Sequence, residues 1–194
     1  MNTVFVDVDT QIDFLFPAGA LYVPGAEEII PLVAALNRHA AGTGATVLSS
    51  MDAHAENDPE FAEWPPHCVA ETMDQQKPAG TLLEGRVVVP SARGAVFSLD
   101  SCRQILIEKQ HVDMFTNANL SFVLHHLQAQ RYVVYGVVTE ICVRHAAFGL
   151  LRRGKLVELV TDAVRSLDEN KAREMFDEFT AAGGLLTTSA AVLG

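Results

Sequence analysis

The cysteine at position 142 stands where an α/β protein would hold a nucleophile. The apolar run at residues 132–138 predicts a buried strand, a short polar turn follows it, and residues 143–151 have the pattern of a helix. A helix N-terminus carries partial positive charge and free N–H groups, so it favours a thiolate and can also hold an oxyanion. The alternative is a buried cysteine that only packs, which is the commoner use of this residue.

Charged residues follow the other predicted strands in the same way. Asp9, Asp52 and Lys109 each come just after an apolar run. Ligands of an open parallel sheet bind beyond the carboxyl ends of its strands, so these side chains are predicted to meet Cys142 at one edge. Asp9 could take the proton of the thiol, and Lys109 could hold the two charges together. The alternatives are a turn residue for Asp9 and a solvated surface residue for Lys109.

A second group has the composition of a metal site. In extended backbone the side chains of Asp52 and His54 point the same way, and His67 can complete a set of two histidines and one carboxylate. Three protein ligands leave open positions, which is typical of a catalytic metal, and this set suits zinc, iron or manganese. The alternative is a pair of hydrogen-bonded loop histidines. His111 lies close enough to Lys109 in sequence to line the same pocket, and Cys68 is interpreted as a packing residue.

The elements that must position these residues alternate along the chain. Several strand-like runs are apolar throughout, as expected for a parallel sheet covered on both faces. Repeated βα units then predict an α/β fold with right-handed crossovers in a single domain, residues 1–194. Residues 51–95 form a long irregular stretch, which in compact domains is usually functional. The predicted strands are 3–8, 45–49, 104–108, 132–137, 156–160 and 184–187, and the predicted helices are 26–41, 119–130, 142–153 and 168–182.

Bulk composition excludes several classes of function. The formal charge of −10, from 24 acidic and 14 basic residues, argues against a nucleic-acid partner. No apolar run approaches the roughly 20 residues that span a bilayer, and the N-terminus has no basic region typical of a signal peptide. Three cysteines without paired spacing favour a reducing, cytoplasmic setting. We expect a homo-oligomer, with the apolar helical residues 146–151 suited to a dimer contact.

Five segments together resemble the nicotinamidase branch of the isochorismatase-like cysteine hydrolases, in that family's order. They are residues 8–14 (VDTQIDF), 52–54 (DAH), 64–69 (WPPHCV), Lys109 and 136–143 (GVVTEICV). The resemblance implies a three-layer α/β sandwich around a six-stranded parallel sheet. It implies Cys142 as nucleophile, Asp9 as base and Lys109 as the third member. It also implies a cis peptide between Val137 and Val138, with the N–H groups of Val138 and Cys142 forming the oxyanion hole.

The activity that the resemblance implies is metal-dependent release of ammonia from a small planar amide, with nicotinamide first. Phe14, Trp64 and Phe115 would be the walls of the pocket. Residues 56–60 lack the further His or Ser that the family's metal loop often carries, and residues 70–76 and 110–115 also differ from the nicotinamidase pattern. Because of these differences, a carbamoyl or ureido compound, or another small amide, remains an alternative substrate. A further alternative function is a catalytically silent metal- or ligand-binding domain. Vinyl-ether hydrolysis of the isochorismatase type needs neither the metal set nor the thiol, so the presence of both in this chain argues against that reaction.

Overall fold

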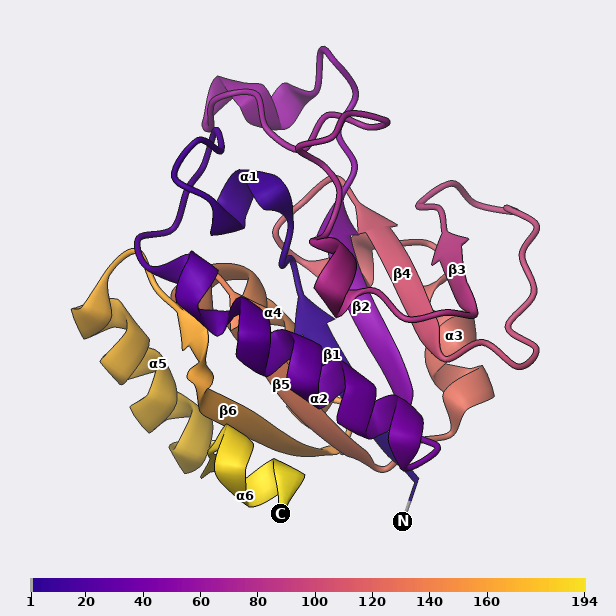
Figure 1. The fold of residues 1–194 in the computed structure, drawn as a ribbon, viewed down its shortest axis with the longest axis vertical. Helices are drawn as coiled ribbons and strands as arrows, with labels where there is room; N and C mark the ends of the chain where they lie inside the picture. The colour runs from indigo at the N-terminus through magenta and orange to yellow at the C-terminus, as the bar shows by residue number, and fades with distance from the viewer. Residues whose placement is uncertain (1) are drawn as a thin grey trace.

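A seven-stranded, all-parallel sheet forms the centre of the protein (Figure 1). The computed structural model describes residues 2–194. The strands run in the order β3-β4-β2-β1-β5-β6-β7, which confirms the predicted parallel sheet. They are β1 (Thr3–Val8), β2 (Thr46–Asp52), β3 (Arg86–Val89), β4 (Gln104–Lys109), β5 (Arg131–Val137), β6 (Leu156–Arg165) and β7 (Leu185–Thr187).

The sheet has one strand more than the sequence predicted. The additional strand is β3, which lies in the stretch 51–95 that was expected to be irregular. It has only four residues, pairs with β4 alone and leaves two of its four side chains exposed. A short edge strand of this kind contributes no continuous apolar run, so its sequence does not distinguish it from a loop.

Helices cover both faces of the sheet and give the predicted three layers. Helix α2 packs with α6 over one face, and α3, α4 and α5 pack over the other (Figure 1). Alternate residues of β1 enter the two cores: Val4, Val6 and Val8 on one side and Phe5 on the other. The longer helices are α2 (Ile30–Gly42), α3 (Leu120–Leu127), α4 (Arg144–Leu151) and α5 (Glu169–Ala181), and the short C-terminal helix is α6 (Ser189–Leu193).

Helix α4 uses its apolar face within the chain. Ala146, Ala147 and Leu150 are buried in the core that α4 shares with α3 and α5. The helix that was expected to suit a dimer contact therefore packs its apolar residues onto its own sheet. Within residues 2–194, none of the helices combines the length and hydropathy needed to cross a bilayer.

Short helical turns and a close approach between β1 and β5 determine the structure at the carboxyl edge of the sheet. Gly136 in β5 has φ of 121°, and a Cβ there would lie 2.1 Å from the carbonyl oxygen of Val8, so only glycine allows β1 and β5 to approach this closely. The expected cis peptide joins Val137 and Val138. The short elements are α1 (Ile12–Leu15), η1 (Ala26–Ile29), η2 (Pro59–Ala62), η3 (Ala79–Thr81), η4 (Met114–Thr116) and the π-helical turn η5 (Thr139–Val143).

Candidate active site

Asp9 and Lys109 form a buried ion pair at the carboxyl edge of the sheet. Asp9 leaves β1 in the left-handed region with φ of 48°, and the side chains of both residues are about 1% exposed. Lys109 Nζ lies 2.9 Å from Asp9 Oδ2 and also contacts Asp52, its direct neighbour in the pairing of β2 with β4. Ser50 Oγ donates to Asp9 Oδ1 at 2.7 Å. Lys109 is thus not a solvated surface lysine.

Cys142 lies in η5, between the end of β5 and the start of α4. The helix predicted from residue 142 begins at Arg144, after this π-helical turn. The thiol is buried, and the charges of both Asp9 and Lys109 influence its pKa, so it lies near their ion pair. Asp9 Oδ2 is paired with Lys109 by charge, but the two groups are not aligned for a hydrogen bond. That oxygen therefore keeps a lone pair free for the proton of the thiol.

The charges in this cluster favour a neutral thiol beside a carboxylate. Burial raises the pKa of the Cys142 thiol well above its ordinary value, although Lys109 acts in the opposite direction. Burial also raises the pKa of Asp9, again against the effect of Lys109. Burial alone would lower the pKa of Lys109, but the Asp52 and Asp9 carboxylates outweigh it and hold that pKa well above its ordinary value. The ammonium stays charged, so it can stabilise a thiolate as the proton leaves.

A second buried ion pair fixes the turn that carries Asp9. Lys77 Nζ lies 3.2 Å from Asp7 Oδ1 and donates to Thr10 Oγ1 at 3.0 Å, and Thr10 Oγ1 donates to Asp7 Oδ1 at 2.6 Å. Asn37 and Ser49 donate to Asp7 Oδ2 at 3.2 and 3.1 Å. This network holds the segment containing Lys77 against β1, and sequence reasoning did not predict it.

The side chains of Asp52, His54 and His67 converge with the geometry of a metal site. Asp52 Oδ2 lies 3.9 Å from His54 Nε2 and 3.8 Å from His67 Nε2. Ligand atoms about 2.1 Å from one tetrahedral ion lie about 3.4 Å apart, so a small inward shift would suffice. Both ring nitrogens of His54 are buried without a hydrogen-bond partner, and a metal ion in this cluster would bind one of them, Nε2. His67 Nδ1 is engaged with the Pro65 carbonyl at 2.8 Å and leaves Nε2 free.

Glu60 is a further polar group at this site that sequence reasoning missed. Its Oε2 is buried without a hydrogen-bond partner and lies 4.0 Å from His54 Nε2. Asp58 caps η2 by accepting from Glu60 N at 3.0 Å, and its other oxygen lies 3.1 Å from His54 Nδ1, too poorly aligned for a hydrogen bond. Asp58-Pro59 is a recognisable helix start, but nothing in the sequence places the following glutamate beside a histidine.

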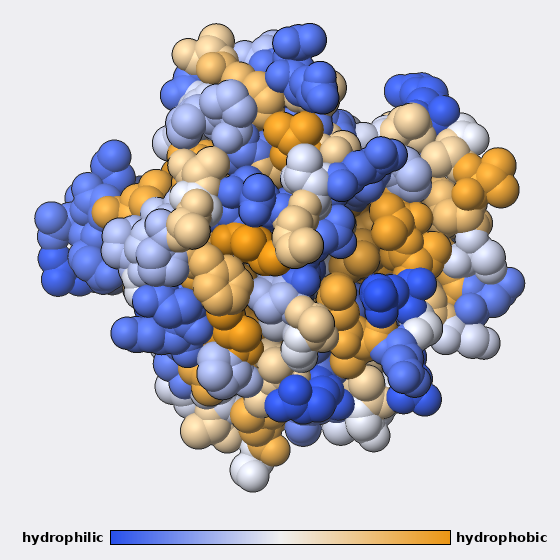
Figure 2. Space-filling model, turned by 45° about the horizontal axis from the view of Figure 1, so that its top comes forward, coloured by the Kyte–Doolittle hydropathy of each residue, from blue (hydrophilic) through white to orange (hydrophobic). Residues whose placement is uncertain are grey.

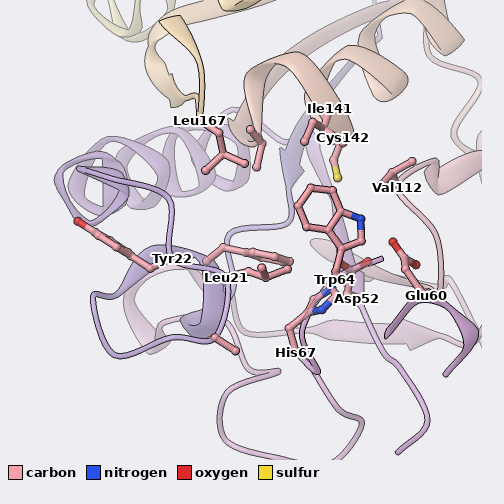
Figure 3. A pocket seen from close by; sticks show the side chains of 13 residues that line it. Leu21, Tyr22, Asp52, Glu60, Trp64, His67, Val112, Ile141, Cys142 and Leu167 are labelled. Carbon is pink, nitrogen blue, oxygen red and sulfur yellow. The ribbon is translucent and has the colours of Figure 1, made fainter. Parts of the chain in front are cut away.

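Cys142 opens into one cavity of about 300 Å³ together with Asp52 and His67 of the metal-type cluster (Figure 3). His54, Asp9 and Lys109 lie behind this surface and do not line the cavity. Phe14 and Trp64 line it as predicted, together with Asp52, His67 and Val138. The other lining residues are Ala20, Leu21, Tyr22, Glu60, Val112, Ile141, Cys142 and Leu167. Figure 2 turns the upper end of the molecule toward the reader and shows apolar and polar side chains intermixed there.

Two residues that were expected beside the pocket lie elsewhere. Phe115 is not among the residues that line the cavity: its ring packs against Gly149 of α4, where a Cβ would lie 2.0 Å from the ring, and beneath the Arg153 guanidinium at 3.8 Å. Because Gly149 has no side chain, the Phe115 ring fits against α4 and packs onto the core, and Val112 lines the cavity instead. The His111 side chain is 66% exposed and also does not line the cavity.

Comparison with known proteins identifies the family. Residues 3–191 match the Isochorismatase domain family over nearly the whole chain. The chain belongs to the isochorismatase family. This family member is 26% identical over 205 residues to the nicotinamidase of Acinetobacter baylyi, an alignment that covers 94% of this chain and 90% of the relative.

Solved structures share the fold of this family member. The pyrazinamidase of Pyrococcus horikoshii in complex with zinc superimposes with a TM-score of 0.80 at 28% identity, covering 97% of this chain and 99% of that one. The N-carbamoylsarcosine amidase of Thermoplasma acidophilum superimposes with a TM-score of 0.78 at 24% identity, covering 97% of each chain. The three-layer fold is therefore that of the isochorismatase-like hydrolases.

Proposed function

We propose that the protein is a metal-dependent cysteine amidohydrolase that releases ammonia from a small planar amide, with nicotinamide as the leading substrate. The observation that carries this proposal is that Cys142 lines one cavity with Asp52 and His67, while the buried Asp9–Lys109 ion pair is linked to the same cavity through the contact of Lys109 with Asp52. A nucleophile, a base and a cation in contact are the groups that acyl transfer requires. Relatives named as a nicotinamidase and a pyrazinamidase support the same reaction class.

In the first half of the reaction, the Cys142 thiol gives its proton to Asp9 as the sulfur attacks the amide carbonyl carbon. The oxyanion accepts hydrogen bonds from the N–H groups of Val138 and Cys142, and each such donor is worth about 3 kcal/mol in comparable sites. Asp9 then passes its proton to the leaving ammonia. In the second half, Asp9 takes a proton from water as the water oxygen attacks the thioester carbon. The C–S bond then breaks, Asp9 returns the proton to the Cys142 sulfur, and the carboxylic acid leaves. Lys109 keeps its charge throughout.

The metal-type cluster fits a divalent ion in this reaction. Asp52, His54 and His67 would hold it, and we propose the unpaired Glu60 carboxylate as a fourth ligand. Zinc is the leading ion, as in the zinc complex of the Pyrococcus horikoshii relative, and iron and manganese suit the same donor set. When bound, the ion would supply a Lewis acid to the cavity.

The charges of the cavity favour a neutral amide over a ureido acid. Within the described residues 2–194, no lysine or arginine lines the cavity, whereas Asp52 and Glu60 do. The nearby Lys109 is already paired with Asp9 and Asp52. A substrate carboxylate would find no lysine or arginine to pair with here, and only a metal ion at the Asp52 cluster could balance its charge, because buried charges need a partner. This argument sets the carbamoyl or ureido acids behind nicotinamide.

The test is ammonia release from a panel of amides by the zinc-loaded protein. We expect turnover of nicotinamide and little turnover of N-carbamoyl amino acids. Benzamide should have a lower kcat/KM, because it has the same shape but lacks the ring nitrogen, which could fill an open position on the metal ion and so orient the substrate. Cys142→Ala should abolish turnover and Cys102→Ala should not, and His54→Ala should lower metal content. Equal kcat/KM for nicotinamide and benzamide would contradict a role for the ring nitrogen, and ammonia from carbamoyl compounds alone would move the assignment to them.

A further inference from the structure

The side chain of Leu167 is unusually exposed for a residue that lines a cavity. It is 49% exposed and lies in the loop between β6 and α5, at the end of the cavity away from Glu60 and Val112 (Figure 3). A single exposed leucine on a surface is ordinary. This one differs because a half-buried carboxylate fixes its backbone.

That carboxylate belongs to Glu140, two residues before the nucleophile. Glu140 Oε1 accepts hydrogen bonds from the N–H groups of Leu167 at 3.0 Å and of Asp168 at 2.9 Å. Asp168 in turn caps α5 by accepting from the N–H groups of Asn170 and Lys171. Because η5 carries both Glu140 and Cys142, the position of Leu167 is tied directly to the nucleophile rather than left to a free loop.

Hydrogen bonds also hold the wall of the cavity opposite Leu167, at the end away from Glu60. Leu21 N donates to the Asp13 carbonyl at 3.3 Å, and the neighbouring Tyr22 hydroxyl donates to Glu27 Oε2 at 2.7 Å and accepts from Gly25 N at 2.9 Å. The Tyr22 hydroxyl is therefore already engaged. A ligand that reaches this end meets the hydrocarbon of Leu21 and Leu167, and Ile141 closes the side next to Cys142 (Figure 3).

We infer that Leu21, Ile141 and Leu167 form an apolar subsite for an alkyl substituent on the ring of the amide substrate, and that Glu140 is the positioning residue that holds Leu167 there. The inference rests on the proposed amidase function and extends its substrate class from nicotinamide to ring-alkylated neutral carboxamides. If the ring nitrogen and the carboxamide of a nicotinamide face the inner polar end, ring carbon 5 points farthest from both. An alkyl group at carbon 5 therefore enters the subsite.

The test compares kcat/KM for nicotinamide, 5-ethylnicotinamide and 5-propylnicotinamide. Each methylene buried against the leucines should raise kcat/KM about fourfold, the equivalent of the transfer free energy of one methylene. In Leu167→Ser the ratio of 5-propylnicotinamide to nicotinamide should fall toward one. Leu185→Ser, which changes an equally exposed leucine (48%) on β7, is the matched control and should leave the ratio unchanged.

Glu140 is tested by the same ratio. Glu140→Ala should lower it mainly through a higher KM for the alkylated substrate, whereas Glu140→Gln should restore it, because the amide oxygen can accept the same two hydrogen bonds. A general loss of folding would affect Glu140→Ala and Glu140→Gln alike, so a difference between them points to the hydrogen bonds that Glu140 accepts. Glu140→Gln as impaired as Glu140→Ala, or an unchanged ratio in Glu140→Ala, would contradict the positioning role.

Failure of the subsite can be told apart from failure of the proposed function. Absence of ammonia from every amide would refute the amidase. The subsite would still be measured by calorimetric binding of the same three compounds to the zinc-loaded Cys142→Ala protein, where the same ratio of affinities is expected. An alkyl group that brings no gain in either measurement, or a Leu167→Ser protein with the wild-type ratio, overturns the subsite.

Discussion

Removal of the Lys77 ammonium should destabilise the protein far more than removal of a surface charge. Lys77 is paired with Asp7 at 3.2 Å, and the two side chains are 1% and 0% exposed. Lys77→Met keeps the length of the side chain but leaves the Asp7 carboxylate buried without a cation. Breaking a buried pair from one side costs roughly 3–5 kcal/mol, because the remaining charge stays desolvated.

The contacts of Asp7 place the expected loss near the lower end of that range. After Lys77→Met, the hydroxyls of Thr10 and Ser49 and the amide of Asn37 still donate to the carboxylate. We therefore expect a loss of about 3 kcal/mol. The Asp7→Asn, Lys77→Met double variant removes both charges and leaves hydroxyls that can rotate to suit the amide, so it should recover at least half of this loss.

Urea unfolding followed by circular dichroism measures the effect. With a slope of about 2–3 kcal/mol per molar for a chain of this size, a loss of 3 kcal/mol lowers the midpoint by about 1–1.5 M. Glu178→Gln is the control, because its pair with Arg144 is 55% and 40% exposed and should be worth less than about 1 kcal/mol. A Lys77→Met protein with the midpoint of Glu178→Gln, or a double variant no more stable than the single one, would refute the reasoning.

Three further outcomes are expected. Asp9→Asn and Lys109→Met should each lower kcat by about a thousandfold or more, with the double variant little worse, because contacting groups act as a unit; additive losses measured by ammonia release would point to separate roles. The pH profile of kcat/KM should have an acid limb with its midpoint above about 3.9, the ordinary pKa of aspartate. Burial raises the pKa of Asp9, and because the base works only when ionised, activity is lost as pH falls through that raised pKa. A midpoint below about 3.9 would contradict the assignment of Asp9 as the base. Gly136→Ala should lower the thermal midpoint much more than Gly44→Ala, because both glycines have positive φ but a Cβ clashes only at Gly136; similar losses would show that β1 and β5 can separate.

The sequence predicted best the residues that directly follow long apolar runs. Asp9, Asp52 and Lys109 each come at the end of a strand buried on both faces, so the rule that parallel strands end at one edge was enough to bring them together. His67 required the motif, because it lies in a loop that returns to the sheet through the single bridge between His54 and Val69.

The residues that the sequence did not predict depend on packing between loops. Glu60 and Leu167 reach the cavity from η2 and from the β6–α5 loop, and no periodic pattern marks either position. Asp7 interrupts an otherwise apolar strand, but its partner Lys77 is 70 residues away. Phe115 lies near Lys109 in sequence, and the space left by Gly149 on a different helix decided where its ring packs.

The pairing of β2 with β4 limits how this chain can change length during evolution. Asp52 lies directly opposite Lys109 in that pairing, so one residue gained or lost in either strand would turn one of the two side chains to the other face of the sheet. Insertions in the segment between β3 and β4, which leaves Val96 fully exposed, carry no such penalty. Length variation among active relatives should therefore accumulate in that segment, while the distance from the start of β4 to its lysine stays constant.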